Sequence, residues 1–427
     1  MKRHIEAFNL LPNTQSAYRA HHSTETAVLK VSSDLLWAVD SGNIGVLVLL
    51  DLSAAFDTVD HEILLKRLTT SCGISGSALN WFTSYLSNRT QHVIYNEMKS
   101  SVIRVGCGVP QGSVLGPMLF TLYTANLTHI MQSNNLTSHL YADDTQIYGW
   151  CKPQDFEALQ TKMSSCLDEV SRWMRSNRLQ LNESITEVMW FGSSRRQHQL
   201  PITALRVGQC EVLPVQSVRD LGIYLDSDMS MVSHINTTVS TCFGALRVLR
   251  AIRHSVPKEM LLTLVSALVL CRLDYGNATL YGLPANQLMK CQAVLNGAAR
   301  LIFGLRSRDH VSGLLHQLHW LRIDERISFK IACLTWRCLY GTGPEYLTND
   351  IHRIAGSHLR AGLRSVNSMN LVQPRTRNVS HGDRAWSSAS PAVWNRLQPE
   401  SIKFDDNYLS FRRSLKCYLW SLSYPTS

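Results

Sequence analysis

The sequence lacks the usual signals of export and of membrane insertion. Its basic start, Met1 to His4, leads straight into an amphipathic stretch rather than into the apolar core of a signal peptide. The longest apolar runs, Ile44–Leu50 and Met260–Cys271, are too short to cross a bilayer. The sequence therefore predicts an intracellular protein, in the cytoplasm, the nucleus or both, that does not span a membrane.

Cysteines with metal-ligand spacing are also missing. The chain has 11 cysteines, an odd number that is scattered through apolar segments. The closest pair, Cys333 and Cys338, has neither a histidine nor a second pair nearby, which argues against a zinc site. Free thiols in a reducing compartment are the simpler interpretation. The sequence shows no repeat period and no low-complexity tract either.

Acidic residues are scarce in one half of the chain only. Residues 1–230 contain 18 basic and 21 acidic side chains, a balance of −3, and residues 231–427 contain 24 and 11, a balance of +13, which together give the formal charge of +10. The composition, 45% hydrophobic and 17% charged, is that of a globular protein. A basic second half indicates contact with a polyanion, for which nucleic acid is the main candidate and plain solvated surface the alternative.

The apolar periodicity predicts a mixed α+β region followed by helices. The predicted strands are Ile44–Asp51, Gln91–Tyr95, Val102–Val105, His139–Tyr141, Thr145–Tyr148, Val188–Phe191 and Val218–Leu225. The predicted helices are His61–Thr70, Ser75–Ser87, one from Pro117 to Gln132, Asp155–Asn177, Thr237–Arg253, Lys258–Cys271, Ala285–Phe303 and Ile323–Tyr340. The order through residues 44–225 predicts an antiparallel sheet with helices on one face. After Gly341 the pattern supports no assignment.

Three aspartates stand where strands end. Asp51 closes a buried strand, where a carboxylate is unfavourable unless it binds a cation or caps a turn. Asp143 and Asp144 are adjacent at the tip of a predicted hairpin, where their charges repel unless a metal neutralises them. Together these acids supply oxygen ligands for two Mg²⁺ ions, with Mn²⁺ possible, which suit in-line displacement at phosphate. Taken singly, each also fits an ordinary polar turn.

A loop rich in glycine and proline lies between these acids in the sequence. It runs from Gly108 through Gln111 and Gly112 to Pro117, with the sequence GVPQGSVLGP. Such residues fix a tight turn before a helix, and glycine permits close approach of the backbone to a ligand. An ordinary strand-to-helix loop is the alternative.

In this order the segments resemble the reverse transcriptases of non-LTR, LINE-type retrotransposons. The matching segments are Leu50–His61, Gly108–Pro117 and Tyr141–Asp144, with Gln15–Arg19 and Ser23-Thr24 in a fingers block, Trp81–Gln91 in an additional block, Trp173, Asn177, Leu181-Asn182 and Thr186-Glu187 in a fourth palm motif, and Asp220–Gly222 in a primer-grip hairpin. The resemblance extends from residue 9 to residue 226. Several ordered motifs are far more specific than any one of them.

The resemblance implies a right-hand polymerase fold and its activity. Partial fingers would occupy residues 1–43, a palm with an inserted fingers segment 44–230, a basic all-α thumb 231–345, and a C-terminal helical region 346–427. The activity implied is that of an RNA-directed DNA polymerase. It would extend a DNA primer along an RNA template with deoxynucleoside triphosphates, by two-metal nucleotidyl transfer.

The resemblance also assigns roles to single residues. Asp51 and Asp143 would be the main ligands of both metals, with Asp144 the third acid and the carbonyl of Leu52 a further ligand.

Three more residues would contact the substrates. Phe56 would be a steric gate against a ribose 2′-hydroxyl, whereas a packed core ring is the plainer interpretation. Gln111 would contact the sugar of the incoming nucleotide, and Gly112 would let the template base approach. Phosphate contacts in the thumb would come from Arg247, Arg250, Arg253 and Lys258.

Two departures from the family pattern lower the expected activity. The chain begins after the family's arginine-bearing fingers segment, with no endonuclease before the polymerase and no Cys/His knuckle after it. Ile185 stands where the family has a lysine, and isoleucine cannot donate a proton. We therefore expect a truncated or decaying copy that retains metal binding but polymerises weakly or not at all.

Other functions are weaker interpretations of the same residues. A non-catalytic nucleic-acid-binding relic is the main alternative. An RNA-templated RNA polymerase has no use for Phe56 as a sugar gate. A metallohydrolase lacks a histidine-rich second site.

Overall fold

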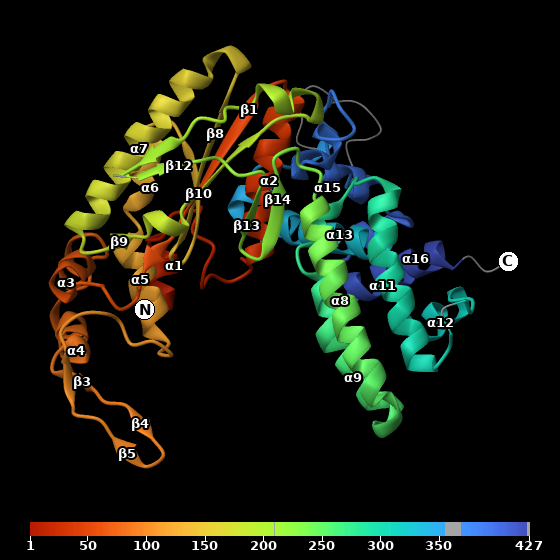
Figure 1. Ribbon diagram of the computed structural model, residues 1–427, viewed down its shortest axis with the longest axis horizontal. Helices are drawn as coiled ribbons and strands as arrows, with labels where there is room; N and C mark the ends of the chain where they lie inside the picture. Colours follow the sequence, from red (N-terminus) through yellow and green to blue (C-terminus); the bar gives the residue numbers. More distant parts are fainter. Residues whose placement is uncertain (209, 307, 355–368, 425–427) are drawn as a thin grey trace. The chain divides into compact units, whose positions relative to one another are not determined.

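The chain forms two compact units, each discontinuous in sequence (Figure 1). A computed structural model describes residues 1–208, 210–306, 308–354 and 369–424. Unit 1 consists of Met1–Ser23, Gly45–Trp190 and Pro201–Val215, and unit 2 of Thr24–Ile44, Phe191–Leu200 and Gln216–Ser427. Among the described residues, no helix is both long enough and apolar enough to span a membrane.

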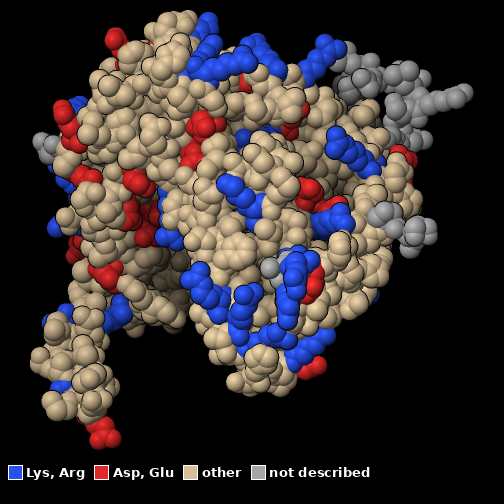
Figure 2. All heavy atoms as spheres, turned by 45° about the vertical axis from the view of Figure 1, so that its right-hand side comes forward, with Lys and Arg blue, Asp and Glu red and all other residues tan. Residues whose placement is uncertain are grey.

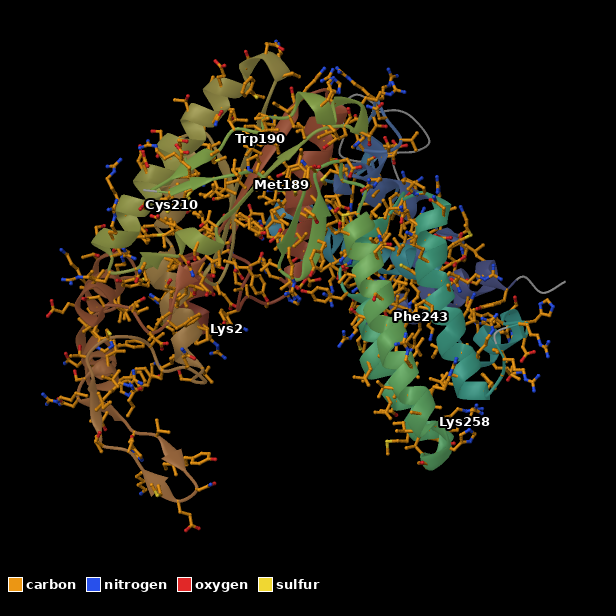
Figure 3. The ribbon with its side chains drawn as sticks, in the orientation of Figure 1. Lys2, Met189, Trp190, Cys210, Phe243 and Lys258 are labelled. Carbon is orange, nitrogen blue, oxygen red and sulfur yellow. The ribbon has the colours of Figure 1, made fainter. Side chains whose placement is uncertain are left out.

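A four-stranded sheet with the order β10-β1-β8-β7 organises unit 1. The strands are β1 (Ile44–Leu50), β7 (Thr137–Tyr141), β8 (Asp144–Cys151) and β10 (Glu187–Phe191). The continuous apolar run of β1 suits an inner strand, and six of its seven residues are buried. Met189 and Trp190 of β10, labelled in Figure 3, are also buried, with 0% and 2% of their surface exposed.

Unit 1 also contains helices, so the predicted mixture of helix and sheet is confirmed. They are α1 (Lys2–Ala7), α3 (His61–Thr70), α4 (Gly76–Leu86), α5 (Leu115–Thr124), α6 (Leu127–Ser133) and α7 (Phe156–Ser176). Helix α7 buries the face that includes Leu159, Met163 and Val170, at the spacing of an amphipathic helix. The predicted helix from Pro117 to Gln132 is two helices, separated at Ala125-Asn126.

One arginine joins three of these helices. The guanidinium of Arg67 on α3 lies over the rings of Tyr123 on α5, at 4.7 Å, and Trp173 on α7, at 5.1 Å. It also donates to Asn177, whose carbonyl oxygen accepts from the Tyr123 hydroxyl at 2.5 Å. Trp173 and Asn177, singled out by resemblance, thus serve packing here.

The predicted strands Gln91–Tyr95 and Val102–Val105 correspond to two short strand pairs with different bounds. β3 (Arg89–Gln91) pairs with β6 (Ile103–Val105), and β4 (Ile94–Tyr95) pairs with β5 (Met98–Lys99). Asn96 and Glu97 both adopt positive φ, which places the turn between β4 and β5. The other short pairs of unit 1 are β2 (Leu52–Ser53) with β9 (Gln180–Leu181), and β11 (Leu205–Val207) with β12 (Cys210–Val212).

Unit 2 is mainly helical and contains a β-hairpin of β13 (Ser217–Asp220) and β14 (Ile223–Asp226). Its helices are α2 (Thr24–Asp40), α8 (Val232–Ile252), α9 (Lys258–Val265), the π-helical turn η5 (Ser266–Leu270), α10 (Cys271–Asp274), α11 (Ala285–Phe303), α12 (Ser312–Gln317), α13 (Ile323–Leu339), α14 (Glu345–Thr348), α15 (Trp386–Asn395) and α16 (Tyr408–Ser423). Among the described residues of both units, the 3₁₀ turns are η1 (Pro153–Asp155), η2 (Glu183–Ile185), η3 (Ser194–Gln199), η4 (Arg253–Ser255), η6 (Asn277–Leu280), η10 (Gly382–Arg384) and η11 (Glu400–Phe404).

Helix α2 was not predicted, because it is buried on nearly every side and shows no clear amphipathic period. Of its 17 residues 13 are buried, as expected for an all-round buried helix. Its Glu25 accepts from Lys330 Nζ at 2.9 Å and from the Ala278 N–H at 3.2 Å, both within unit 2. Helix α2 thus belongs to the core of unit 2.

The segment after Gly341, left without assignment from sequence, contributes core to unit 2 where it is described. Trp386 and Trp394 of α15 have 1% and 0% of their surface exposed. Their indole N–H groups donate to the carbonyl oxygens of Leu347 and Met369, both at 2.9 Å. In the face drawn in Figure 2, Lys and Arg side chains gather densely over unit 2.

Candidate active site

The three aspartates lie at the ends of neighbouring strands of unit 1. Asp51 directly follows β1, and Asp144 is the first residue of β8, its neighbour in the sheet. Asp143 occupies the two-residue turn between β7 and β8, where Tyr141 pairs with Asp144. The sheet order therefore brings together acids that are some ninety positions apart in the sequence.

The electrostatics of the carboxylates indicate that they share one site. Loss of water around Asp143 raises the pKa of its carboxyl, and the charge of Asp51 raises it further. The Asp144 side chain has an exposed surface, yet the protein around it displaces enough water to raise its pKa to about 6, with the charges of Asp143 and Asp51 adding to the shift. Such mutual shifts arise when like charges lie close together.

The oxygen atoms of the three aspartates suit a hard divalent cation, although they are not arranged as a complete metal site. Across the described ranges, no three His, Cys, Asp or Glu side chains are grouped so as to hold a metal ion. Asp51 instead uses Oδ1 to accept from the Leu52 N–H at 2.9 Å. Carboxylate and carbonyl oxygens are nevertheless the ligands that Mg²⁺ prefers, and a cation would relieve the repulsion among the acids.

A buried glutamine supports the turn that carries Asp143. Gln15 has 1% of its surface exposed, and its Oε1 accepts from the backbone N–H groups of Ala142, at 3.1 Å, and of Ala17, at 2.9 Å. Ala142 has a φ of 58°, a conformation that is strained for a residue with a Cβ. The resemblance implied only a place in a fingers block for Gln15, because nothing in the sequence links it to a turn 127 residues away.

The segment after Asp51 and the glycine loop are bound to each other. The Val109 N–H donates to the Phe56 carbonyl oxygen at 2.8 Å, and the Gly108 N–H to that of Val59 at 2.7 Å. His61 Nε2 donates to the Gly108 carbonyl oxygen at 2.8 Å. These bonds hold two predicted motifs in one fixed arrangement.

Two glycines of the loop, Gly108 and Gly112, differ in what surrounds them. A Cβ on Gly108, at φ +83°, would lie 2.8 Å from the Asp57 carbonyl oxygen and 2.9 Å from its Cα, so only glycine fits against this backbone. A Cβ on Gly112, at φ +77°, would meet nothing within 4 Å. The close approach at Gly108 is to the chain itself, whereas Gly112 borders open space that a ligand can enter.

Gln111 and Phe56 have partners that the sequence did not predict. Gln111 is exposed, and its Nε2 donates to both carboxylate oxygens of Asp57 at 2.9 Å. The half-buried ring of Phe56 stacks on Phe120 of α5, with a centroid distance of 4.4 Å and an angle of 26°. The packed-ring interpretation of Phe56 thus has a structural partner, although the residue is not fully buried.

Of the remaining predicted residues, two lie in unit 1 and four in unit 2. Leu52 lies in β2, paired with Leu181 of β9, directly after Asp51. Ile185 lies in the turn η2 with 51% of its surface exposed. The four basic residues proposed for phosphate contacts, Arg247, Arg250, Arg253 and Lys258, belong to unit 2. Of these, Lys258, labelled in Figure 3, has its Nζ 4.2 Å from the centroid of the Phe303 ring.

Comparison with known proteins shows the family to which the chain belongs. The family model described as reverse transcriptase (RNA-dependent DNA polymerase) matches residues 1–225, more than half of the chain. The fold is therefore of the polymerase class. The chain belongs to the reverse transcriptase family.

Individual relatives are mobile-element proteins of Drosophila melanogaster. The chain is 27% identical over 249 residues to the RNA-directed DNA polymerase from mobile element jockey, covering 55% of this chain and 25% of the relative. It is 27% identical over 309 residues to a probable RNA-directed DNA polymerase from transposon X-element, covering 70% of this chain and 33% of the relative. The chain thus spans a quarter to a third of the length of these curated relatives. The predicted resemblance to non-LTR retrotransposon enzymes is confirmed.

One solved structure is similar at a lower level. Telomerase from Candida albicans, in complex with the TWJ fragment of telomeric RNA, has 13% identity and a TM-score of 0.35, with 77% of this chain and 55% of that chain covered. A likeness of this size supports no further argument.

Proposed function

We propose that this chain is the polymerase core of a reverse transcriptase that extends a DNA primer on an RNA template. The observation that carries the proposal is the convergence of Asp51, Asp143 and Asp144 at neighbouring strand ends, in a chain of this family. Under this proposal residues 44–230 act as the palm, 1–43 as partial fingers and 231–345 as the thumb. The basic second half then holds the duplex through its phosphates.

The three carboxylates would hold two Mg²⁺ ions, with the Leu52 carbonyl as a further ligand. Bound there, the ions would lower the pKa of the primer 3′-hydroxyl and neutralise the leaving pyrophosphate. The chain's own part is to fix the ligands. β1 and β8 set the spacing of the acids, and Gln15 holds the backbone from which Asp143 projects.

The second motif would position the incoming nucleotide. Both carboxylate oxygens of Asp57 accept from the Gln111 amide nitrogen, which orients the side chain and would leave its carbonyl oxygen Oε1 to accept from a sugar hydroxyl. The open space beside Gly112 would admit the templating base. Phe56, whose ring stacks on Phe120, would contact the sugar and exclude a 2′-hydroxyl.

Ile185 would make the polymerase slow rather than abolish metal binding. An exposed isoleucine cannot protonate the leaving pyrophosphate, as the lysine of the family motif is expected to do. General acid catalysis contributes roughly 10²–10⁴-fold to a rate. The variant Ile185→Lys is therefore expected to raise the extension rate by about a hundredfold.

Primer extension on an RNA template with Mg²⁺ tests the proposal. Asp143→Asn should lower the rate at least about a thousandfold, because the lost ligand contributes several kcal/mol to the transition state. Asp155→Asn is the matched control, since it removes an exposed carboxylate of unit 1 beyond the other end of β8. Equal rates in the two variants would contradict the assignment of the site. To raise the signal, both are made in the Ile185→Lys background.

The gate assignment of Phe56 has its own test. Phe56→Ala should raise the use of ribonucleotides relative to deoxyribonucleotides by about a hundredfold or more, because a steric clash is removed. Phe120→Leu is the control, since it removes the packing partner and keeps the Phe56 ring. An unchanged ratio in Phe56→Ala, with stability lowered equally in both variants, would make Phe56 a core ring only.

The non-catalytic relic remains the second candidate, favoured by Ile185 and by the open ligand set. It predicts binding of a primer–template duplex that does not change with Asp51→Asn and no extension even in Ile185→Lys. Binding and extension measured on the same preparation separate the two candidates.

A further inference from the structure

A basic cavity lies in unit 2, and its lining includes none of the acids of the candidate active site. Its volume is about 350 Å³, which is in the range of small-ligand sites. Four elements line it: η6 with the end of α10, the segment between α12 and α13, α13 itself, and α16. We refer to it as the basic cavity.

Four cations line the cavity, and two of them already have acidic partners. Arg326 Nε donates to Asp274 Oδ1 at 2.8 Å, and Lys330 Nζ to Glu25 Oε2 at 2.9 Å. Arg412 and Lys416, both exposed, have no ion pair with an acid within 4.0 Å in the described part of the chain. The cavity therefore carries positive charge that the fold does not neutralise.

The two remaining cations are placed to share one anion. Arg412 and Lys416 are four residues apart on α16, so they are neighbours on one helix face. Like charges at this spacing destabilise a helix slightly. The Arg412 guanidinium lies over the rings of Phe329, at 5.9 Å, and Tyr408, at 5.5 Å. An anion between the two side chains would relieve their repulsion.

Aromatic surface forms another part of the same lining. Trp320, Phe329 and His319 all contribute to it. His319 has a φ of 52°, and its ring stacks on Trp420 with a centroid distance of 5.9 Å and an angle of 29°. Aromatic rings beside the two neighbouring cations Arg412 and Lys416 suit a ligand that has a flat face and a phosphate.

We propose that the basic cavity binds one nucleotide unit, with its phosphate between Arg412 and Lys416 and its base against the aromatic lining. The unit is either a free nucleotide or one unstacked nucleotide of a single strand, and both present the same chemistry. A duplex fits less well, because its bases are already stacked on each other and cannot enter. This proposal does not depend on catalysis at the aspartates.

Fluorescence anisotropy of a labelled oligouridylate of about ten nucleotides tests the proposal. The full chain carries Asp143→Asn, and the buffer contains EDTA, so that polymerisation plays no part. Arg412→Ala should weaken binding roughly tenfold, because a charge-assisted contact is lost. Arg413→Ala is the matched control: it removes the same exposed charge from the next position of α16, outside the cavity lining. Equal losses would reduce the effect to general charge and overturn the proposal.

Competition distinguishes the two sources and tests the aromatic lining. If a free nucleotide is the ligand, uridine monophosphate should displace the probe, and inorganic phosphate should do so far less well. If a strand is the ligand, only unlabelled oligouridylate competes at similar concentration. Phe329→Leu should weaken the binding of the nucleotide or strand by about tenfold, because stacking on the ring is lost. Phosphate competing as well as the nucleotide would overturn the assignment of the base.

A crosslink shows where the strand lies. An oligonucleotide with 4-thiouridine, irradiated on the full chain, should attach to Trp320 or Phe329, and Arg412→Ala should abolish that product. Attachment only to peptides of unit 1 would overturn the proposal. Far-UV circular dichroism and thermal unfolding of each variant verify that it is folded, so that a loss of binding reports the cavity.

Discussion

The β7–β8 hairpin of unit 1 and the β13–β14 hairpin of unit 2 both have two-residue turns, but different residues form these turns. In the β7–β8 hairpin of unit 1 the turn residues are Ala142 and Asp143, and in the β13–β14 hairpin of unit 2 they are Leu221 and Gly222. Leu221 and Gly222 both have positive φ, 45° and 87°, the pattern of a type I′ turn. In the first hairpin only Ala142, at 58°, has positive φ.

A group from a distant part of the same unit supports each turn. Gln15 Oε1 accepts from the Ala142 N–H at 3.1 Å, and the Tyr275 hydroxyl donates to the Leu221 carbonyl oxygen at 2.5 Å. The difference lies in what the turn carries. Where a glycine would suit the backbone, the first hairpin has Ala142, which directly precedes the two carboxylates, and the bond to Gln15 compensates for the strain.

Removing the support from the first turn is expected to have the largest effect. Gln15→Leu keeps the volume but leaves two buried N–H groups without an acceptor, which costs about 1–3 kcal/mol for each group. A small displacement of Asp143 should lower the extension rate about a hundredfold and raise the Mg²⁺ concentration needed for half-maximal rate. Gln15→Glu, which keeps an acceptor, should restore most of the Mg²⁺ response.

Tyr275→Phe makes the equivalent change at the second turn. It removes the donor to Leu221 and should lower the free energy of unfolding by about 1 kcal/mol, with no change in the Mg²⁺ midpoint. If Gln15→Leu lowers stability but leaves the Mg²⁺ midpoint where it is, the glutamine supports the fold and not the site.

Substitution of a turn residue with positive φ should have opposite effects on stability in the two hairpins. Gly222→Ala forces a Cβ to φ +87° and to within 3.2 Å of the Tyr275 ring, and should destabilise by about 1–3 kcal/mol. Ala142→Gly relieves strain but adds backbone entropy to the unfolded chain, so the net change should be a gain of under about 1 kcal/mol. Urea unfolding midpoints measure both. Destabilisation of similar size in both variants would show that Ala142 is not strained.

The sequence predicted the positions of the acids but not what holds them. Asp51 and Asp143 could be placed because an apolar run and an alternating pair of short strands are local patterns. The bonds of Gln15 to Ala142 and of Gln111 to Asp57 join residues 127 and 54 positions apart. Such contacts depend on tertiary packing, which local periodicity does not encode.

Glycine and burial account for the other differences. The sequence indicated close approach at the glycine loop but could not say of what, and at Gly108 it is the Asp57 backbone. Helix α2 was missed for a related reason: a helix buried on all sides has no polar face to give a period. The strand pairing between residues 89 and 105 depends on a turn at Asn96-Glu97. No glycine marks this turn in the sequence, so the bounds of the strands could not be predicted.

The smallest expected effect concerns pH, and it follows from the charges that the first turn carries. The pKa of Asp144 is raised from 3.8 to about 6 in the folded chain. Between these values the folded state holds a proton that the unfolded state has lost, so stability should fall as pH rises from about 4 to about 6 and stay lower above it. In EDTA at pH 7, Asp144→Asn should therefore melt at a slightly higher temperature than the natural chain, and at pH 4 it should not.

Mg²⁺ and a distant carboxylate separate this effect from general charge. At pH 7 Mg²⁺ should raise the melting temperature of the natural chain more than that of Asp144→Asn, because a bound cation replaces the proton as the counter-charge. Asp155→Asn, whose exposed carboxylate lies on η1 beyond the far end of β8, should follow the natural chain at both pH values. If the melting temperature of Asp155→Asn in EDTA rises as much as that of Asp144→Asn, the repulsion comes from the net charge of the surface. The turn between β7 and β8 would then be under no more electrostatic strain than the turn between β13 and β14.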